Sequence, residues 1–170
     1  MLFNSVEFFM FFPIVVLLYW VIPKKVRYLW LLVASYYFYM GWNARYAILI
    51  AVSTGITYLC GLGIEALGKK EEKKYLVARK LVVAAGFVSN LGILFFYKYF
   101  DFFLENCNHI LTALGKEPVV NGFSVLLPVG ISFYTFQALG YMVDVYRGEI
   151  IAEKNPLKYA LFVSFFPQLV

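Results

Sequence analysis

The chain has 170 residues, of which 62% are hydrophobic, 21% are aromatic and only 15% are charged, with a formal net charge of +5. Soluble domains average about 45–50% apolar and about 25% charged residues. A soluble fold of this length could not bury so much apolar surface. The composition therefore excludes an ordinary soluble domain and predicts an all-α protein, a polytopic bundle of transmembrane helices.

Hydropathy predicts about five membrane spans. The first apolar run has no Lys or Arg before it and no small-residue cleavage site after it, so we expect an uncleaved anchor and not a signal peptide. The first two spans are short against the usual ~20 residues. Tyr and Trp flank the loops, as expected at headgroup depth. The expected spans are Phe8–Ile22, Tyr28–Trp42, Tyr46–Ile64, Leu81–Tyr97 and Leu126–Val143.

Basic residues are concentrated in two of the predicted loops. The first loop carries Lys24, Lys25 and Arg27, and the loop at 68–80 carries six more, so together they hold nine of the fifteen basic residues. The positive-inside rule then places both loops in the cytoplasm and the N-terminus outside. Topology explains the positive net charge, and no nucleic-acid partner is expected.

After the fourth span, residues from about 98 to 116 alternate between apolar and polar positions at helical spacing. We expect an amphipathic helix on the outer surface of the membrane. Its polar face includes or adjoins His109, the only histidine. A lone surface histidine has no partner set for metal or nucleophilic chemistry, so no catalytic role is expected, and no metal site is predicted. Cys60 and Cys107 show no metal or disulfide spacing.

The fifth span carries a polar stripe. Tyr134, Gln137, Tyr141 and Asp144 are spaced i, i+3, i+7 and i+10, so a helix places them on one face. Such groups avoid hydrocarbon, and they either join neighbouring helices or line a wet cavity. Both alternatives stay open. In either case we expect Gln137 to face protein or water, and Leu139 to face lipid.

The chain ends within a mostly apolar run, residues 159–170, that is too short to cross a bilayer. No polar cap closes this run. We therefore expect the sequence to be a fragment, truncated from a longer membrane protein.

Three stretches carry a resemblance to a known family. They are the opening MLFNSVEFFMFFPIVVLLYW, the fifth-span stretch LLPVGISFYTFQALGYMVDVYR and the ending FVSFFPQLV. They resemble the membrane-bound O-acyltransferase superfamily, and within it the bacterial alginate O-acetyltransferases and D-alanyl-transfer proteins. The resemblance covers essentially the whole chain, which would be the N-terminal part of one membrane domain, residues 1–170.

The resemblance implies a bacterial inner-membrane bundle of about ten or more helices around a tunnel. An acetyl or D-alanyl group would pass from an acyl thioester donor onto a hydroxyl of a cell-envelope polymer, and no bound cofactor is implied. Besides the lipid bilayer, the implied partners are envelope-modification proteins or an acyl carrier. The family's catalytic histidine lies in a Trp-His-Gly-like context that no position here matches. The resemblance therefore places the catalytic residue beyond Val170, and this chain alone is expected to be inactive.

The residues that match the family's motifs are expected to line or brace the tunnel. Among them, Pro128 and Gly130 would break the chain at the entrance of the fifth span, and Asp144 could pair with Arg147 at its cytoplasmic mouth. The full set is Pro128, Gly130, Ser132, Tyr134, Gln137, Tyr141, Asp144, Arg147 and Gln168.

Two other functional classes fit the same features. A transporter also builds its site from a span interrupted by Pro and Gly, and a non-catalytic membrane scaffold subunit would need only the bundle. A second interrupted span would favour transport, whereas a Trp-His-Gly-like histidine further along the gene would favour acyl transfer.

Overall fold

The structure is a computed structural model that describes residues 5–41, 44–69, 73–117 and 130–169. All of its regular elements over these residues are helices, which confirms the predicted all-α class. In chain order they are α1 (Val6–Val21), α2 (Arg27–Met40), α3 (Ala44–Gly68), α4 (Lys73–Ala113), α5 (Ile131–Arg147), α6 (Pro156–Ser164) and the 3₁₀ helix η1 (Phe166–Leu169).

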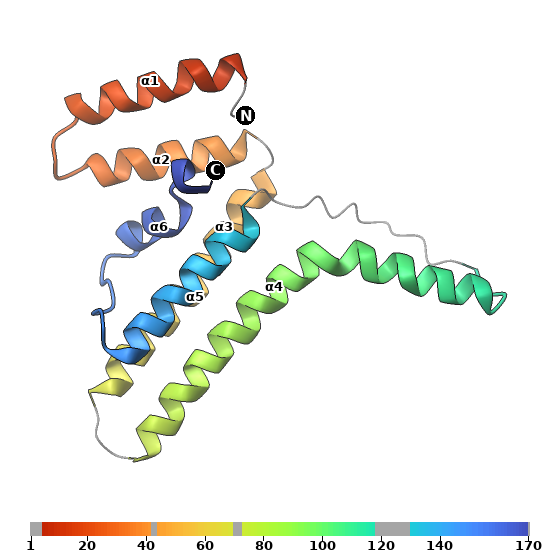
Figure 1. Cartoon of the computed structure of the whole chain (residues 1–170). Helices are drawn as coiled ribbons and strands as arrows, with labels where there is room; N and C mark the ends of the chain where they lie inside the picture. Colours follow the sequence, from red (N-terminus) through yellow and green to blue (C-terminus); the bar gives the residue numbers. More distant parts are fainter. Residues whose placement is uncertain (1–4, 42–43, 70–72, 118–129, 170) are drawn as a thin grey trace.

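Two packed layers hold the helices together (Figure 1). In the first, α3 and α5 lie side by side and the N-terminal half of α4 packs along them. Its core includes Ile50, Ile64, Ala138 and Met142, each no more than 1% exposed. In the second, α1 and α2 form a hairpin whose aromatic side chains close around Phe166 of η1. Because α6 packs on both α2 and α3, it joins the two layers.

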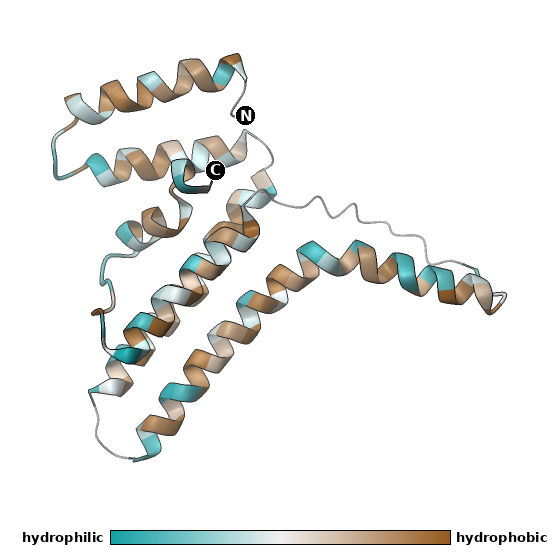
Figure 2. Cartoon of the chain, in the orientation of Figure 1, coloured by the Kyte–Doolittle hydropathy of each residue, from teal (hydrophilic) through white to brown (hydrophobic). Residues whose placement is uncertain are grey.

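Two of the described helices, α3 and α4, are long and apolar enough to cross a membrane. The helix α1 is apolar but shorter, with 16 residues, and α2 and α5 have 14 and 17. All three fall below the ~20 residues that span a bilayer upright. Large apolar side chains remain exposed over much of the surface, as Figure 2 shows in brown along α1 and α4. Five spans therefore remain a prediction beyond the two that length and composition support.

The fourth predicted span and the amphipathic helix are one element in the structure. The helix α4 has 41 residues and bends about midway, so that its C-terminal part points away from the bundle (Figure 1). The predicted boundary at residue 98 is thus not a break, because neither Gly nor Pro occurs between residues 93 and 114 to interrupt the helix. The helix ends in a Schellman motif in which the Lys116 amide donates to the Leu111 carbonyl and Gly115 has φ 69°.

The predicted loop at 68–80 is also mostly helical. The helix α3 continues to Gly68 and α4 begins at Lys73, so the basic residues from Lys73 to Lys80 lie on the first turns of α4. Lysine and arginine are good helix formers, and their charges can reach water from a helix as well as from a loop. The position of this segment in the cytoplasm remains a prediction.

The fifth helix is displaced along the sequence from the predicted span 126–143. It begins at Ile131, directly after Gly130 with φ 78°, and ends at Arg147, before Gly148 with φ 80°. A left-handed residue at each end stops the helical hydrogen-bond pattern, and glycine adopts that conformation without steric cost. Pro128 lies outside the described residues.

Candidate functional site

The predicted polar stripe on α5 divides into two environments. Tyr134 is completely buried in the main core, in the same cluster as Tyr39 of α2. Gln137, Tyr141 and Asp144 instead line a pocket of about 480 Å³ between α5, the 148–155 segment and α6. We call this the α5–α6 pocket. The stripe therefore contributes to helix packing at one end and lines a pocket at the other.

Gln137 joins α5 to the end of α6. Its side-chain amide donates to the Phe162 carbonyl at 2.9 Å and to Gln168 Oε1 at 3.3 Å. The Phe162 carbonyl lacks its ordinary helical donor, because the amide of Phe166 donates to Ser35 Oγ at 3.4 Å. Pro167 cannot replace that donor, since proline has no N–H.

Gln137 and Gln168 come from two of the three stretches that carried the family resemblance, and the structure brings them into contact. The amide group of Gln137 is thus occupied in bracing α6, and its Oε1 is buried without a hydrogen-bond partner among the described residues. Leu139, expected to face lipid, is only 3% exposed. That prediction was wrong, because α5 packs against α3, α4 and α6 and so has more than one buried face.

Three side chains fix the segment between α5 and α6. Glu65 Oε2 accepts a hydrogen bond from the Ala152 amide at 2.8 Å, and the Tyr141 hydroxyl accepts one from the Glu153 amide at 2.8 Å. The Tyr58 hydroxyl donates to the Lys154 carbonyl at 2.6 Å. Because consecutive residues are bound by groups from α3 and α5, this wall of the pocket has a defined shape.

A buried hydrogen-bond chain connects α6 to the two long apolar helices, α3 and α4. Tyr159 of α6 donates to Thr57 Oγ1 at 2.8 Å, and Thr57 donates in turn to the Ser53 carbonyl at 2.9 Å. Burial raises the pKa of Tyr159, so its hydroxyl keeps the proton that it donates. The Ser53 hydroxyl also bonds Asn90 Oδ1 of α4 at 2.5 Å. These contacts are the interhelical polar packing that apolar helices use.

Arg79 of α4 holds the end of α5. Its Nη2 donates to the Val145 carbonyl at 3.2 Å and to the Tyr146 carbonyl, and its guanidinium lies 4.8 Å from the centre of the Tyr146 ring. A cation at a helix C-terminus satisfies carbonyls that have no helical donor and opposes the helix dipole. The sequence indicated only a cytoplasmic charge at this position, since nothing in the pattern reveals a contact between residues 66 positions apart.

The predicted Asp144–Arg147 pair is not formed. Arg147 instead approaches Glu149, with 3.7 Å between Nη1 and Oε1. The chain reverses at Gly148, and that turn places Glu149 within reach of the arginine while Asp144 faces the pocket. Of the other motif residues, Ser132 is half-buried in the first turn of α5 and Gln168 is exposed beside Gln137.

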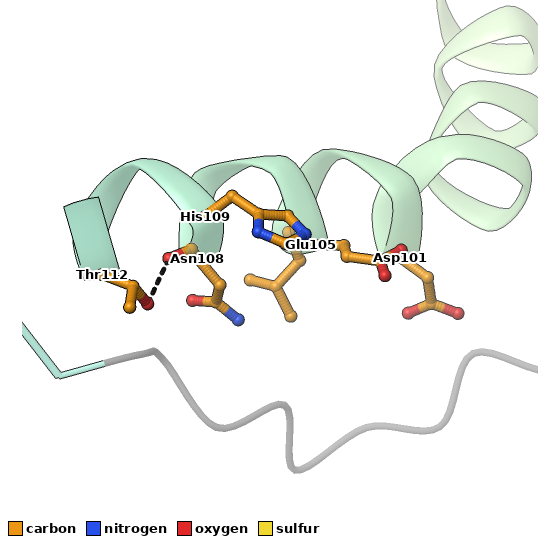
Figure 3. A pocket seen from close by; sticks show the side chains of 6 residues that line it. Asp101, Glu105, Asn108, His109 and Thr112 are labelled. Atoms are coloured by element: carbon orange, nitrogen blue, oxygen red, sulfur yellow. Dashed lines mark hydrogen bonds between the residues drawn. The ribbon is translucent and has the colours of Figure 1, made fainter.

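His109 lies on the part of α4 that extends away from the bundle. Figure 3 shows its imidazole above Glu105, along a polar face that also carries Asp101, Asn108 and Thr112. The side chain is exposed. Over the residues that the structure describes, no group of three or more potential ligands could hold a metal ion.

Comparison with known proteins gives clear relatives. The chain is 39% identical to a probable alginate O-acetylase of Pseudomonas aeruginosa, over 98% of this chain and 31% of that protein. It is 40% identical to a probable alginate O-acetylase of Pseudomonas putida, over 98% of this chain and 33% of the relative. A peptidoglycan O-acetyltransferase of Helicobacter pylori is 32% identical, over the whole of this chain and 36% of the relative.

The chain spans about a third of the length of the curated relatives that it matches. No protein-family model matches it, and no solved structure matches it. The identity of 32–40% nevertheless extends along nearly all of the residues of this chain. The chain is therefore a homologue of the bacterial alginate and peptidoglycan O-acetyltransferases, which confirms the resemblance seen in its motifs.

Proposed function

We propose that the protein containing this chain is a membrane O-acyltransferase that transfers an acetyl group to a hydroxyl of a cell-envelope polysaccharide. The observation that carries this proposal is the 39% identity to a probable alginate O-acetylase over 98% of the chain. The second kind of relative acts on peptidoglycan by its name, which favours an envelope polymer over other acceptors. Among the relatives compared, all are named for acetyl transfer, so acetyl is preferred here to D-alanyl.

In the proposed reaction, the acceptor hydroxyl attacks the carbonyl carbon of an acyl thioester. A new ester bond forms, the bond from the carbonyl carbon to sulfur breaks, and the hydroxyl proton passes to a general base while the thiol leaves. We infer that this base lies in another part of the full-length protein. His109 is a poor candidate, because it is exposed on a helix that extends away from the α5–α6 pocket.

The motif residues of this chain brace the machinery and do not perform its chemistry. Gln137 supports this role most directly, since both hydrogens of its amide group are directed at the end of α6 and at Gln168. Tyr141 holds the 148–155 segment, and Arg79 holds the end of α5. A scaffold of this kind would keep the walls of a substrate tunnel at fixed distances, as catalysis by proximity requires.

We also propose a multi-pass position in the inner membrane, with the N-terminus outside and the basic end of the bundle in the cytoplasm. Contacts between helices support the proposal that the basic residues gather at one end of the bundle. Arg79 joins the start of α4 to the end of α5, and the Lys158 ammonium of α6 lies 5.9 Å from the centre of the Tyr28 ring near the start of α2. Partner proteins or an acyl carrier would supply the thioester on that side.

A gene deletion tests the activity. Loss of the full-length gene should lower the ester-linked acetate of the host's envelope polysaccharide, and the wild-type gene should restore it. Gln137→Leu should restore less, because the Phe162 carbonyl loses its donor. Phe136→Leu is the matched control, since Phe136 is the neighbouring residue and is 60% exposed. Unchanged polysaccharide acetate after the deletion would contradict the proposal.

A further inference from the structure

The α5–α6 pocket contains opposite charges that do not pair with one another. Asp144 comes from α5, Glu153 from the 148–155 segment and Lys158 from α6. The ion pairs found among the described residues involve other side chains, Glu65 with Lys69 and Arg147 with Glu149. Glu153 accepts one backbone hydrogen bond, from Asn155. The Lys158 ammonium lies 5.9 Å from the centre of the Tyr28 ring, so Asp144, Glu153 and Lys158 face the pocket without an ion pair among them.

Aromatic rings line the same pocket as these charges. The ring centres of Tyr141 and Tyr159 are 4.5 Å apart, and Phe162 lies 6.2 Å from Tyr141 and 6.1 Å from Tyr159. Cationic groups bind near aromatic faces, and carboxylates beside them strengthen the attraction. The pocket also offers the buried Oε1 of Gln137 as an unused acceptor. This lining is complementary to a primary ammonium group.

The net charge of the lining argues against a purely anionic ligand. With Asp144 and Glu153 against Lys158, the pocket carries one more negative than positive charge. Like charges brought together in a desolvated site are unfavourable. A ligand with one ammonium and one phosphate group would satisfy the carboxylates and the lysine together, whereas phosphate alone would satisfy only the lysine.

Two exposed isoleucines at the rim of the pocket indicate that its ligand is a lipid. Ile150 and Ile151 line the pocket, and they are 41% and 79% exposed. Their exposure does not reflect a loose loop, because the next three residues are held by Glu65, Tyr141 and Tyr58. Acyl chains lying across such a rim would remove apolar surface from water.

We propose that the α5–α6 pocket binds the headgroup of a zwitterionic aminophospholipid such as phosphatidylethanolamine. The ammonium group lies between Asp144 and Glu153, the phosphate contacts Lys158, and the acyl chains cover Ile150 and Ile151. The pocket is at the basic end of the bundle, where α5 ends beside the start of α4, which is the level expected for headgroups. This lipid site does not depend on the proposed acyl transfer.

The test is lipid retention by the full-length protein, measured by native mass spectrometry. Delipidated protein is offered equal amounts of phosphatidylethanolamine and phosphatidylglycerol. We expect one bound phosphatidylethanolamine, preferred about tenfold, and about tenfold weaker retention in Asp144→Asn and Lys158→Gln. Glu149→Gln and Lys154→Gln are the matched controls, because these neighbouring exposed charges do not line the pocket and should leave retention unchanged.

Three results would overturn the proposal. Equal retention of the two lipids would show that the amine is not recognised, and equal losses in the control variants would show that the binding is only general charge attraction. Displacement of the lipid by an equal concentration of a soluble acetyl thioester would assign the pocket to the acyl donor. If Asp144→Asn is not recovered as monodisperse protein, the comparison of Lys158→Gln with Lys154→Gln decides the question alone.

Discussion

Gly86 of α4 packs directly against Met142 of α5, and its replacement by alanine should weaken the bundle. A Cβ added to Gly86 would sit 2.2 Å from Met142 Cε, 2.9 Å from Met142 Sδ and 3.2 Å from Cys60 Sγ. The end of a methionine side chain can normally move aside. Here Met142 is 0% exposed, so moving it displaces other core atoms. Overpacking of a well-packed core costs about 1–3 kcal/mol.

Gly92 in the same helix provides the matched control. A Cβ there would have nothing within 4 Å. Both substitutions gain the same helix propensity, about 0.8–1 kcal/mol in favour of alanine, so this contribution cancels in the comparison. The free energy of unfolding of Gly86→Ala should therefore be lower than that of Gly92→Ala by about 1–3 kcal/mol.

The assay is thermal or denaturant unfolding of the full-length protein in one detergent, with both variants measured side by side. A double-mutant cycle with Met142→Ala identifies the contact, because the penalty of Gly86→Ala should shrink once the methionine end is gone. Equal stability of the two glycine variants would refute the close packing of α4 on α5. An unchanged penalty in the Met142→Ala background would place the clash elsewhere.

The other predictions concern charge, chemistry and topology. Arg79→Gln should lower the free energy of unfolding by about 1–3 kcal/mol, because the last carbonyls of α5 lose a charged donor. The control Lys80→Gln should change the free energy of unfolding little. Equal effects of the two substitutions would mean that Arg79 acts only as a surface charge. His109→Ala should leave polysaccharide acetylation near wild type, and a complete loss would show that the exposed histidine is catalytic. Cysteines introduced at Lys25 and Lys73 should resist a membrane-impermeant thiol reagent in intact cells, and labelling of either would reverse the predicted orientation.

Sequence alone determined the class of protein and much of its helical content. Apolar composition of this degree requires burial in lipid or protein, and hydrocarbon requires that backbone groups bond within helices, so the all-α prediction followed from solvation. The relationship to the O-acetyltransferases was also visible in the sequence, because the resemblance in its motifs agrees with an identity of 32–40% over nearly the whole chain. The sequence determined the boundaries of the helices less well. Neither a bend in α4 nor a left-handed glycine before α5 changes the hydropathy pattern.

Only the tertiary structure decided what the polar residues contact. Helical periodicity placed Tyr134, Gln137 and Asp144 on one face, but it could not show that this face meets a buried core at one end and a pocket at the other. Gln137 reaches the carbonyl of Phe162, 25 residues away, and Arg79 reaches that of Val145, 66 residues away. Such contacts depend on how helices are arranged in space. Periodicity records only local geometry, which is why the sequence identified the polar side chains and the fold selected their partners.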